Sequence, residues 1–231
     1  MIKAVIFDFD HTLYDRLLTY EKFYDGFYAH FKDILNPTLS REEMIATMHQ
    51  ADQEGLYINE WPGIYDKYVE KGIFTSAPGF ENFFPYVKKY YPEAIVVHKD
   101  AVETMETLHS LGLKTGIFTN CEKGAPEYQH DKIDRTPLRQ HMDAILTSAE
   151  AGYEKPDARA FIKICRLLEV KPEEAIYVGD NPAKDVCGAR GVCMTPVWMK
   201  FYPVWPEALP RPPYEIDHLI EVVDIVKQLN K

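Results

Sequence analysis

Short apolar runs rich in β-branched residues recur along this chain. Four are distinct and a fifth is a weaker candidate: Ala4–Phe7, Lys114–Thr119, Asp143–Thr147, Ala175–Val178 and Met194–Val197. A continuous apolar run of this length is typical of a strand that is buried on both faces of a sheet. Such strands occur mainly in sheets covered by helices on both sides, so the pattern restricts the chain to few folds.

Helical patterns lie between these runs. Asp100 is placed to cap a helix whose apolar residues recur every third position and which ends at Gly112. Ala158–Leu168 carries apolar residues on one face, and Asp217 can cap a last helix. Strands that alternate with helices predict βαβ units, and therefore an α/β fold with a mostly parallel sheet flanked by helices.

One stretch, residues 15–97, interrupts this alternation. It contains helical patterns and many aromatic residues, among them Tyr20, Phe23, Tyr24, Phe27, Tyr28 and Phe31 at helical spacing. Rings at this spacing form one face of an amphipathic helix, so we expect most of them to pack in a core. We therefore predict an α/β core domain of residues 1–14 and 98–231 and an inserted α-helical domain of residues 15–97.

The composition excludes several classes of protein. With 46% hydrophobic and 27% charged residues, the chain has the composition of a folded soluble protein. Its net charge of −10 disfavours nucleic-acid binding, and no apolar run approaches the roughly 20 residues that cross a bilayer. Four cysteines without metal-binding spacing, and no signal-peptide pattern, predict reduced thiols in a cytoplasmic protein. The sequence is compatible with a monomer or a homodimer.

Acidic residues follow two of the predicted strands. Asp8 and Asp10 come after the first run, and Asp180 and Asp185 come after Ala175–Val178. In parallel sheets the carboxyl ends of the strands meet at one edge, so these four carboxylates should crowd together. Like charges at such range are costly unless a cation binds, and Mg²⁺ prefers carboxylate oxygens. Each residue alone is also common in turns, so it is their joint occurrence that predicts a magnesium site.

The order of these residues resembles the haloacid dehalogenase-like hydrolase superfamily. Its four motifs match Asp8-Phe9-Asp10-His11-Thr12-Leu13, Ile117-Phe118-Thr119-Asn120, Lys155-Pro156-Asp157, and Gly179-Asp180 through Asp185. The resemblance covers about residues 1–14 and 98–231. It implies a Rossmann-like core with a helical cap domain inserted between the first and second motifs.

The resemblance also implies catalytic roles. Asp8 would attack phosphorus and form an aspartyl-phosphate, while Asp10 would protonate the leaving group and then deprotonate water. Thr119 and Asn120 would bind the phosphoryl oxygens. Lys155 would place an ammonium beside Asp8 and the phosphate, which offsets the repulsion between two anions.

The same resemblance implies a set of metal ligands. Asp8 and Asp180 would bind Mg²⁺ together with the backbone carbonyl of Asp10. Asp185 would be a further ligand or would orient the others. We therefore expect a magnesium-dependent phosphatase for a small phosphorylated metabolite, such as a sugar phosphate, a phosphoglycolate-like acid or a nucleotide monophosphate.

Alternative activities follow from related branches. Dehalogenases resemble D-x-Y at the first motif, so Asp10 favours phosphoryl chemistry. Phosphoglucomutase-like phosphotransferases share D-x-D, so this activity is a second possibility. A catalytically silent binding domain is a third, although the retention of Asp8 and Asp180 argues against it. Phosphonate cleavage would need a lysine of the insertion, and we expect Lys22, Lys32 and Lys67 to be solvated.

Substrate choice is expected to rest with the insertion, which would close over the site and exclude water. Tyr14 and Arg16 are candidate substrate contacts because they directly follow the first motif. Residues 55–61, 72–74 and 201–205 could also contribute, although core packing explains them equally well. No catalytic role is assigned to His11.

Overall fold

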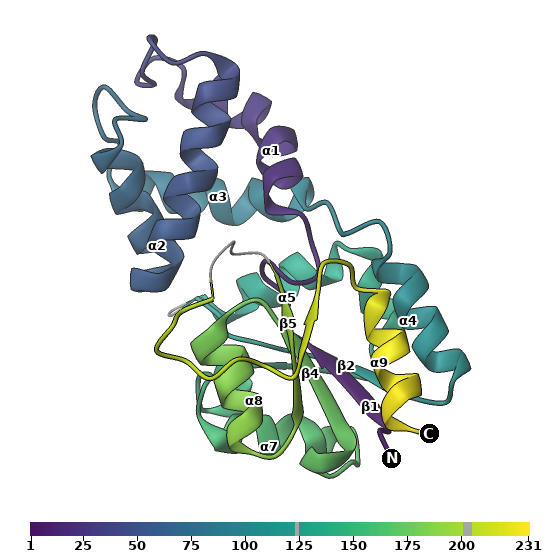
Figure 1. The fold of residues 1–231 in the computed structure, drawn as a ribbon. Helices are drawn as coiled ribbons and strands as arrows, with labels where there is room; N and C mark the ends of the chain where they lie inside the picture. Colours follow the sequence, from purple (N-terminus) through teal and green to yellow (C-terminus); the bar gives the residue numbers. More distant parts are fainter. Residues whose placement is uncertain (123–124, 201–204) are drawn as a thin grey trace. The chain divides into compact units, whose positions relative to one another are not determined.

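The computed structural model describes residues 1–122, 125–200 and 205–231, apart from the side chains of residues 56–60. The chain forms two compact units (Figure 1). An α/β unit contains Met1–Tyr14 and Val97–Lys231, and a helical unit contains Asp15–Val96.

A six-stranded parallel sheet forms the centre of the α/β unit, with the strand order β3-β2-β1-β4-β5-β6. The strands are β1 (Ala4–Phe7), β2 (Lys114–Thr119), β3 (Ala144–Thr147), β4 (Ala175–Gly179), β5 (Thr195–Met199) and β6 (Tyr214–Ile216). All residues of β1 and β4 are buried, as their apolar sequences predict. The predicted α/β fold with a mostly parallel sheet is therefore confirmed.

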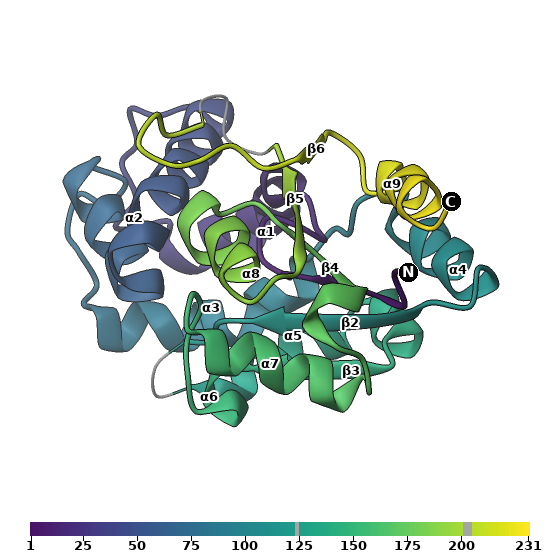
Figure 2. The ribbon, with the colours of Figure 1, turned by 60° about the horizontal axis from the view of Figure 1, so that its bottom comes forward.

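Helices cover both faces of this sheet. In Figures 1 and 2, α7 and α8 lie on one face, whereas α4 and α9 lie side by side on the other. The helical segments of the unit are α4 (Ala101–Ser110), α5 (Pro126–Asp134), η1 (Pro137–His141), α6 (Ser148–Ala151), α7 (Ala158–Leu167), η2 (Pro172–Glu174), η3 (Pro182–Cys187), α8 (Gly188–Gly191) and α9 (Glu221–Leu229). The core beneath α7 includes Phe161 and Ile164, packed against Phe118 and Tyr177 of the sheet.

Asp100 is the N-cap residue that the sequence predicted but lacks the expected cap hydrogen bond, and the predicted start of the last helix at Asp217 was wrong. Asp100 precedes α4, but its carboxylate makes no cap there and instead accepts a hydrogen bond from Ile220 N (3.0 Å). Asp217 does not cap the last helix, because α9 begins at Glu221 and the Glu221 carboxylate accepts from Asp217 N (3.0 Å). A carboxylate near a helix start therefore serves here to join two neighbouring helices or to order the preceding turn.

The sheet has one more strand than the apolar runs predicted. The weaker candidate became β5, shifted by two residues at its end, and β6 follows a proline-rich stretch of the sequence that shows no apolar run. Since β6 is a three-residue edge strand, it pairs with one neighbour and carries no continuous apolar run.

The helical unit contains α1 (Arg16–Phe31), α2 (Arg41–Glu70) and α3 (Phe80–Ala94). Its core is aromatic: the ring of Phe27 lies 4.9 Å from that of Phe31 and 6.2 to 6.4 Å from those of Tyr68, Phe74 and Phe83. Most of the rings predicted to be core residues are buried, but Tyr28 is 50% exposed. Aromatic burial of this kind supplies the unit with its own hydrophobic core.

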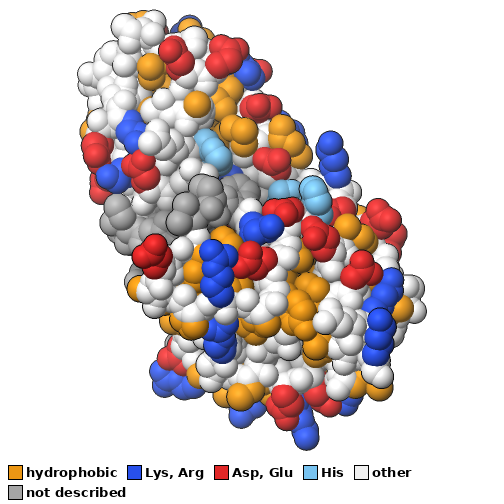
Figure 3. All heavy atoms as spheres, in the orientation of Figure 1, with side chains coloured by type: hydrophobic (Ala, Val, Ile, Leu, Met, Phe, Trp, Pro, Cys, Tyr) orange, Lys and Arg blue, Asp and Glu red, His pale blue; other side chains and the backbone are white. Residues whose placement is uncertain are grey.

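The described surface, helices and cysteines bear on the sequence predictions of charge, membrane spans and thiols. On the face of the α/β unit drawn in Figure 3, acidic and basic side chains are interspersed, and its described atoms form no continuous basic area. No helix within the described residues combines the length and apolarity required to span a membrane. The thiols of Cys121, Cys165, Cys187 and Cys193 are free.

Candidate active site

Asp8 follows β1, the strand beside which the strand order reverses: β2 and β3 are added on one side of β1, and β4, β5 and β6 on the other. β1 lies between β2 and β4, and its last residue, Phe7, pairs with Val178 of β4. The next backbone N–H, that of Asp8, donates to Val178 O (2.8 Å) and so continues the ladder by one residue. The ends of β1 and β4 therefore bring Asp8 next to the Gly179-Asp180 turn, at the edge where parallel sheets bind ligands.

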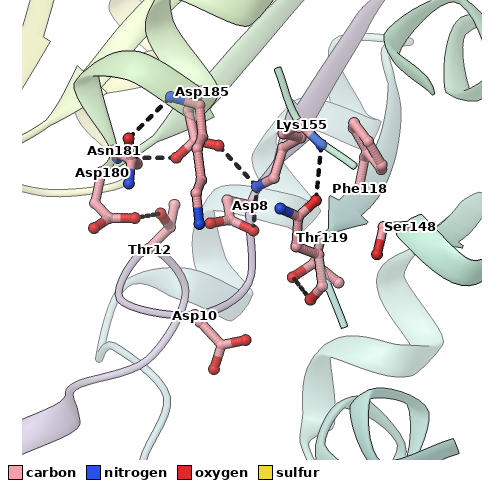
Figure 4. Close-up of polar contacts among 12 residues, drawn as sticks. Asp8, Asp10, Thr12, Phe118, Thr119, Ser148, Lys155, Asp180, Asn181 and Asp185 are labelled. Atoms are coloured by element: carbon pink, nitrogen blue, oxygen red, sulfur yellow. Dashed lines mark hydrogen bonds and ion pairs between the residues drawn. The ribbon is translucent and has the colours of Figure 1, made fainter. Parts of the chain in front are cut away.

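Three buried carboxylates meet at this edge. Asp8, Asp180 and Asp185 are 7%, 4% and 0% exposed, and each offers one oxygen within 4.8 Å of the others. The ammonium of Lys155 lies 2.8 Å from Asp8 Oδ1 and 2.7 Å from Asp185 Oδ1 (Figure 4). One buried cation thus faces three carboxylates, which leaves the cluster with excess negative charge when all are ionised.

The environment shifts the pKa values of these groups. Burial raises the pKa of Asp8 to about 6, with a smaller contribution from the charge of Asp185, although Lys155 opposes the rise. Burial likewise holds the pKa of Asp180 well above its usual value. Burial disfavours the charge on Lys155, but Asp185 and Asp8 outweigh it and keep the pKa of this ammonium high. Oxygen donors with unbalanced negative charge fit a hard divalent cation.

Local structure holds the Asp180–Asp185 segment in place. The Asn181 side chain caps η3 by accepting from Ala183 N (3.0 Å) and Lys184 N (2.9 Å), and Asp185 Oδ2 accepts from Asn181 N (2.9 Å). A Cβ on Gly179 would lie 2.5 Å from the Asp185 side chain, so only glycine leaves room for this carboxylate. Asp185 therefore bonds the Lys155 ammonium through Oδ1 and the Asn181 backbone through Oδ2.

The carboxylate of Asp10 does not join the cluster. Crowding of four carboxylates was expected, but three come together, whereas Asp10 is bonded to Lys132, Gln129 and Tyr14. Lys132 Nζ lies 2.6 and 2.8 Å from its two oxygens. The chain bends at Phe9 and turns at Asp10, and so the two aspartates have different neighbours.

The second motif lies at the end of β2. Thr119 Oγ1 accepts from Gln129 Nε2 (2.9 Å) and donates to the backbone carbonyl of Asn120 (3.2 Å). Asn120 Oδ1 accepts from Lys155 N (2.9 Å), which ties the second motif to the third. Tyr177, which sequence analysis missed, accepts from Lys155 Nζ (3.1 Å) and donates to Phe118 O (2.7 Å).

Two residues expected to contact substrate have other functions in the fold. Tyr14 is fully buried and donates to Asp10 Oδ1 (2.6 Å). Arg16 is 2% exposed inside the helical unit, where its guanidinium donates to Asp52 Oδ1 (3.0 Å) and Tyr91 OH (3.1 Å). Neither side chain is therefore available to select a substrate.

The remaining candidates are core residues, surface groups or residues outside the described part of the chain. Trp61, Ile73, Phe74 and Trp205 are buried, as the core-packing interpretation predicts. Lys22 and Lys32 are exposed, and Lys67 pairs with Glu70 (2.6 Å), which raises its pKa. A lysine that forms a Schiff base needs a lowered pKa, so Lys67 does not suit phosphonate cleavage. The side chains of residues 56–60 and all of residues 201–204 lie outside the described residues.

Comparison with known proteins identifies the family. A family model described as haloacid dehalogenase-like hydrolase matches residues 5–199. The chain belongs to this family. Over the full length of both chains it is similar to the glyceraldehyde 3-phosphate phosphatases of Methanopyrus kandleri, with 31% identity, and Methanocaldococcus jannaschii, with 29% identity. The predicted family and the predicted enzyme class are thereby confirmed, because relatives of this hydrolase are phosphatases.

Solved structures agree with this assignment. A haloacid dehalogenase-family phosphatase from Thermococcus onnurineus has a TM-score of 0.64 and 27% identity, with 97% of this chain and 98% of that chain covered. A family hydrolase from Bacillus subtilis, solved with bound magnesium, has a TM-score of 0.77 over the same shares of the two chains, at 20% identity. The latter similarity shows the shared fold.

Proposed function

We propose that this hydrolase is a magnesium-dependent phosphatase that removes phosphate from small phosphorylated metabolites through an aspartyl-phosphate on Asp8. One observation carries the proposal: a buried nucleophile candidate, Asp8, shares an ammonium with Asp185 and lies in a cluster with Asp180. A carboxylate can attack a phosphate dianion only if other groups neutralise the charge, and this arrangement supplies one cation and a place for another.

The chain's own residues define each step. Asp8 forms a P–O bond in line with the leaving oxygen, and Asp10 gives that oxygen its proton as the P–O bond to the leaving group breaks. Asp10 then takes a proton from the water that cleaves the acyl phosphate and regenerates Asp8. Lys155 stays beside Asp8 throughout and offsets the negative charge of the phosphoryl group.

The metal would be held by Asp8 and Asp180, with the Asp10 carbonyl as a third oxygen. When bound, Mg²⁺ would neutralise the charge that gathers on the phosphoryl oxygens and fix the line of attack. We take Asp185 mainly as an orienting group for Lys155, because Lys155 and Asn181 N bond its two oxygens, and it lies close enough to Asp8 and Asp180 to be a further ligand.

Thr119 and Asn120 are proposed to contact the phosphoryl group. Since Asn120 Oδ1 accepts from Lys155 N, its contact with phosphate would come from the amide nitrogen. A pocket of about 510 Å³ lies beside this motif, and Cys121, Ser148 and Tyr153 are among its lining residues.

A phosphate-release screen tests the proposal. Phosphorylated substrates should include glyceraldehyde 3-phosphate and phosphoserine, on which relatives act by name, together with phosphoglycolate, sugar phosphates and nucleotide monophosphates. We expect release that requires Mg²⁺, stops with a chelator and is abolished in Asp8→Asn. Asp224→Asn is the matched control, because that carboxylate is 86% exposed. Undiminished release by Asp8→Asn would refute the proposal.

The same assay separates a phosphotransferase from a phosphatase. A phosphotransferase would require a bisphosphate activator and would move phosphate to the substrate, whereas the proposed enzyme releases inorganic phosphate without one. Stimulation by the activator, with no net phosphate release, would favour the phosphotransferase.

A further inference from the structure

The carboxylate of Asp10 is held by three side chains, which we call the Asp10 cradle: Tyr14, Gln129 and Lys132. Tyr14 OH donates to Oδ1 (2.6 Å), and Gln129 Nε2 donates to Oδ2 (2.7 Å). Lys132 Nζ reaches both oxygens, at 2.6 and 2.8 Å. Donors to both oxygens fix the plane of the carboxylate as well as its position.

The two cradle residues of α5 are arranged for this contact. Gln129 and Lys132 are three residues apart and therefore lie on the same face of the helix. Both are buried, at 2% and 5% exposure, which is unusual for these residue types. The Lys132 ammonium also lies 5.8 Å from the Phe9 ring centroid and 5.3 Å from that of Tyr128. Burying a lysine costs side-chain entropy and desolvation of the ammonium. A lysine that only made the surface polar would stay exposed, so the burial of Lys132 needs another explanation.

Gln129 also links the cradle to the second motif. The same Nε2 that bonds Asp10 Oδ2 donates to Thr119 Oγ1 (2.9 Å). A single amide thus sets the distance between the proposed acid and a proposed phosphate-binding hydroxyl. This contact would relate the leaving oxygen, which Asp10 protonates, to the phosphoryl oxygens that Thr119 contacts.

We propose that Gln129 and Lys132 are positioning residues for Asp10, which they hold apart from the Asp8–Asp180–Asp185 cluster and aim at the leaving oxygen. This inference rests on the proposed function. In the proposed step Asp10 enters protonated, its O–H bond breaks as the P–O bond of the leaving group breaks, and the alcohol departs with the proton. The three donors of the cradle then hold the carboxylate that forms. A carboxyl group free to rotate would be aimed at that oxygen for a smaller fraction of the time.

Leaving-group dependence provides the test. 4-Nitrophenolate leaves without a proton, whereas phenolate, whose conjugate acid has a pKa of about 10 as in tyrosine, needs one. The experiment compares kcat for 4-nitrophenyl phosphate and phenyl phosphate in wild type, Lys132→Met, Lys132→Arg and Gln129→Met. Lys132→Met keeps the apolar stem and removes the cation.

Since positioned acid–base groups contribute about 10²–10⁴ in rate, partial misplacement in Lys132→Met should lower kcat for phenyl phosphate about 10- to 100-fold. For 4-nitrophenyl phosphate kcat should fall about threefold or less, because its leaving group needs no proton from Asp10. Lys132→Arg should restore part of the difference, and Gln129→Met should show the same selectivity at a smaller size. Arg135→Met is the control, because it removes an exposed cation that follows α5.

An equal loss on both substrates, or no loss, in Lys132→Met and Gln129→Met would overturn the inference. Thermal stabilisation by Mg²⁺ is measured in parallel, and it should match wild type because neither residue belongs to the metal cluster. If Lys132→Met does not fold, the neutral Gln129→Met variant decides the question by itself. The proposed function is tested independently by Asp8→Asn. If wild type turns over and Asp8→Asn does not, the proposed function stands even when the Lys132 and Gln129 variants contradict this inference.

Discussion

Neutralising Asp8 should stabilise the metal-free protein while it abolishes activity. Asp8 is buried with Asp180 and Asp185, and the Lys155 ammonium pairs with only Asp8 and Asp185 among these three carboxylates. Folding raises its pKa from 3.8 to about 6, mainly through burial. At about 1.4 kcal/mol per pKa unit, this difference corresponds to about 3 kcal/mol of stability lost at pH 7, where the carboxyl is ionised in both states. Asp8→Asn removes that cost.

The pH dependence has a defined sign. Between pH 3.8 and about 6 the folded state holds the Asp8 proton that the unfolded state has released, so the free energy of unfolding falls as pH rises. The advantage of Asp8→Asn should therefore be small near pH 4, grow through this window and level off above it. For a chain of this size 1 kcal/mol corresponds to about 2–4 °C in melting temperature, so about 6–12 °C is the upper limit at pH 7.

Thermal unfolding of both proteins from pH 4 to 8, with and without Mg²⁺, measures this effect. Mg²⁺ should raise the melting temperature of wild type far more than that of Asp8→Asn, and so reduce or reverse the difference. Asp224→Asn, which changes an exposed carboxylate, should show neither effect. A metal-free Asp8→Asn protein that is less stable than wild type at pH 7, or an advantage independent of pH, would refute the charge argument.

Two further substitutions probe the packing that supports each unit. Gly179→Ala places a Cβ 2.5 Å from the Asp185 side chain, so we expect kcat to fall at least about tenfold as Lys155 loses its orienting partner, whereas Gly191→Ala, with no atom within 4 Å, should keep wild-type kcat. Equal rates in both would contradict the assigned role of Asp185. Arg16→Met leaves the buried Asp52 without its guanidinium and should lower the free energy of unfolding by about 3–5 kcal/mol, measured by denaturant titration. Arg16→Met/Asp52→Leu should recover most of that loss, and a double variant as unstable as the single one would show that the ion pair is not the cause.

The sequence predicted what the backbone topology determines. Apolar runs located β1, β2, β3 and β4, and the residue after each run lies at the same edge of the sheet because the strands are parallel. Asp8 and Asp180 therefore meet without any information about side-chain conformation. β6 was missed because a three-residue edge strand has no buried apolar run that the sequence could reveal.

Side-chain partners were predicted less well. Arg16 closely follows the first motif in sequence. It is the first residue of α1, however, and its side chain is buried in the core of the helical unit, where Asp52 compensates its charge. Tyr14 was likewise judged by proximity in sequence, but it contacts Asp10 inside the fold. A signal for the cradle was available in Gln129 and Lys132, two polar residues spaced for one face of a helix that follows β2, but polar residues at this spacing are common on exposed helices.

The two aspartates of the first motif have opposite surroundings, and this difference matches the two roles proposed for them. Asp8 faces other carboxylates, so its charge is costly in the metal-free protein. In the proposed mechanism, a bound cation would favour the ionised form that attacks phosphorus. Asp10 faces an ammonium and two neutral donors, so its orientation does not depend on the metal. Different environments allow two neighbouring carboxyl groups to take different chemical roles. Here the difference is produced by α5 on one side and the Asp180–Asp185 turn on the other.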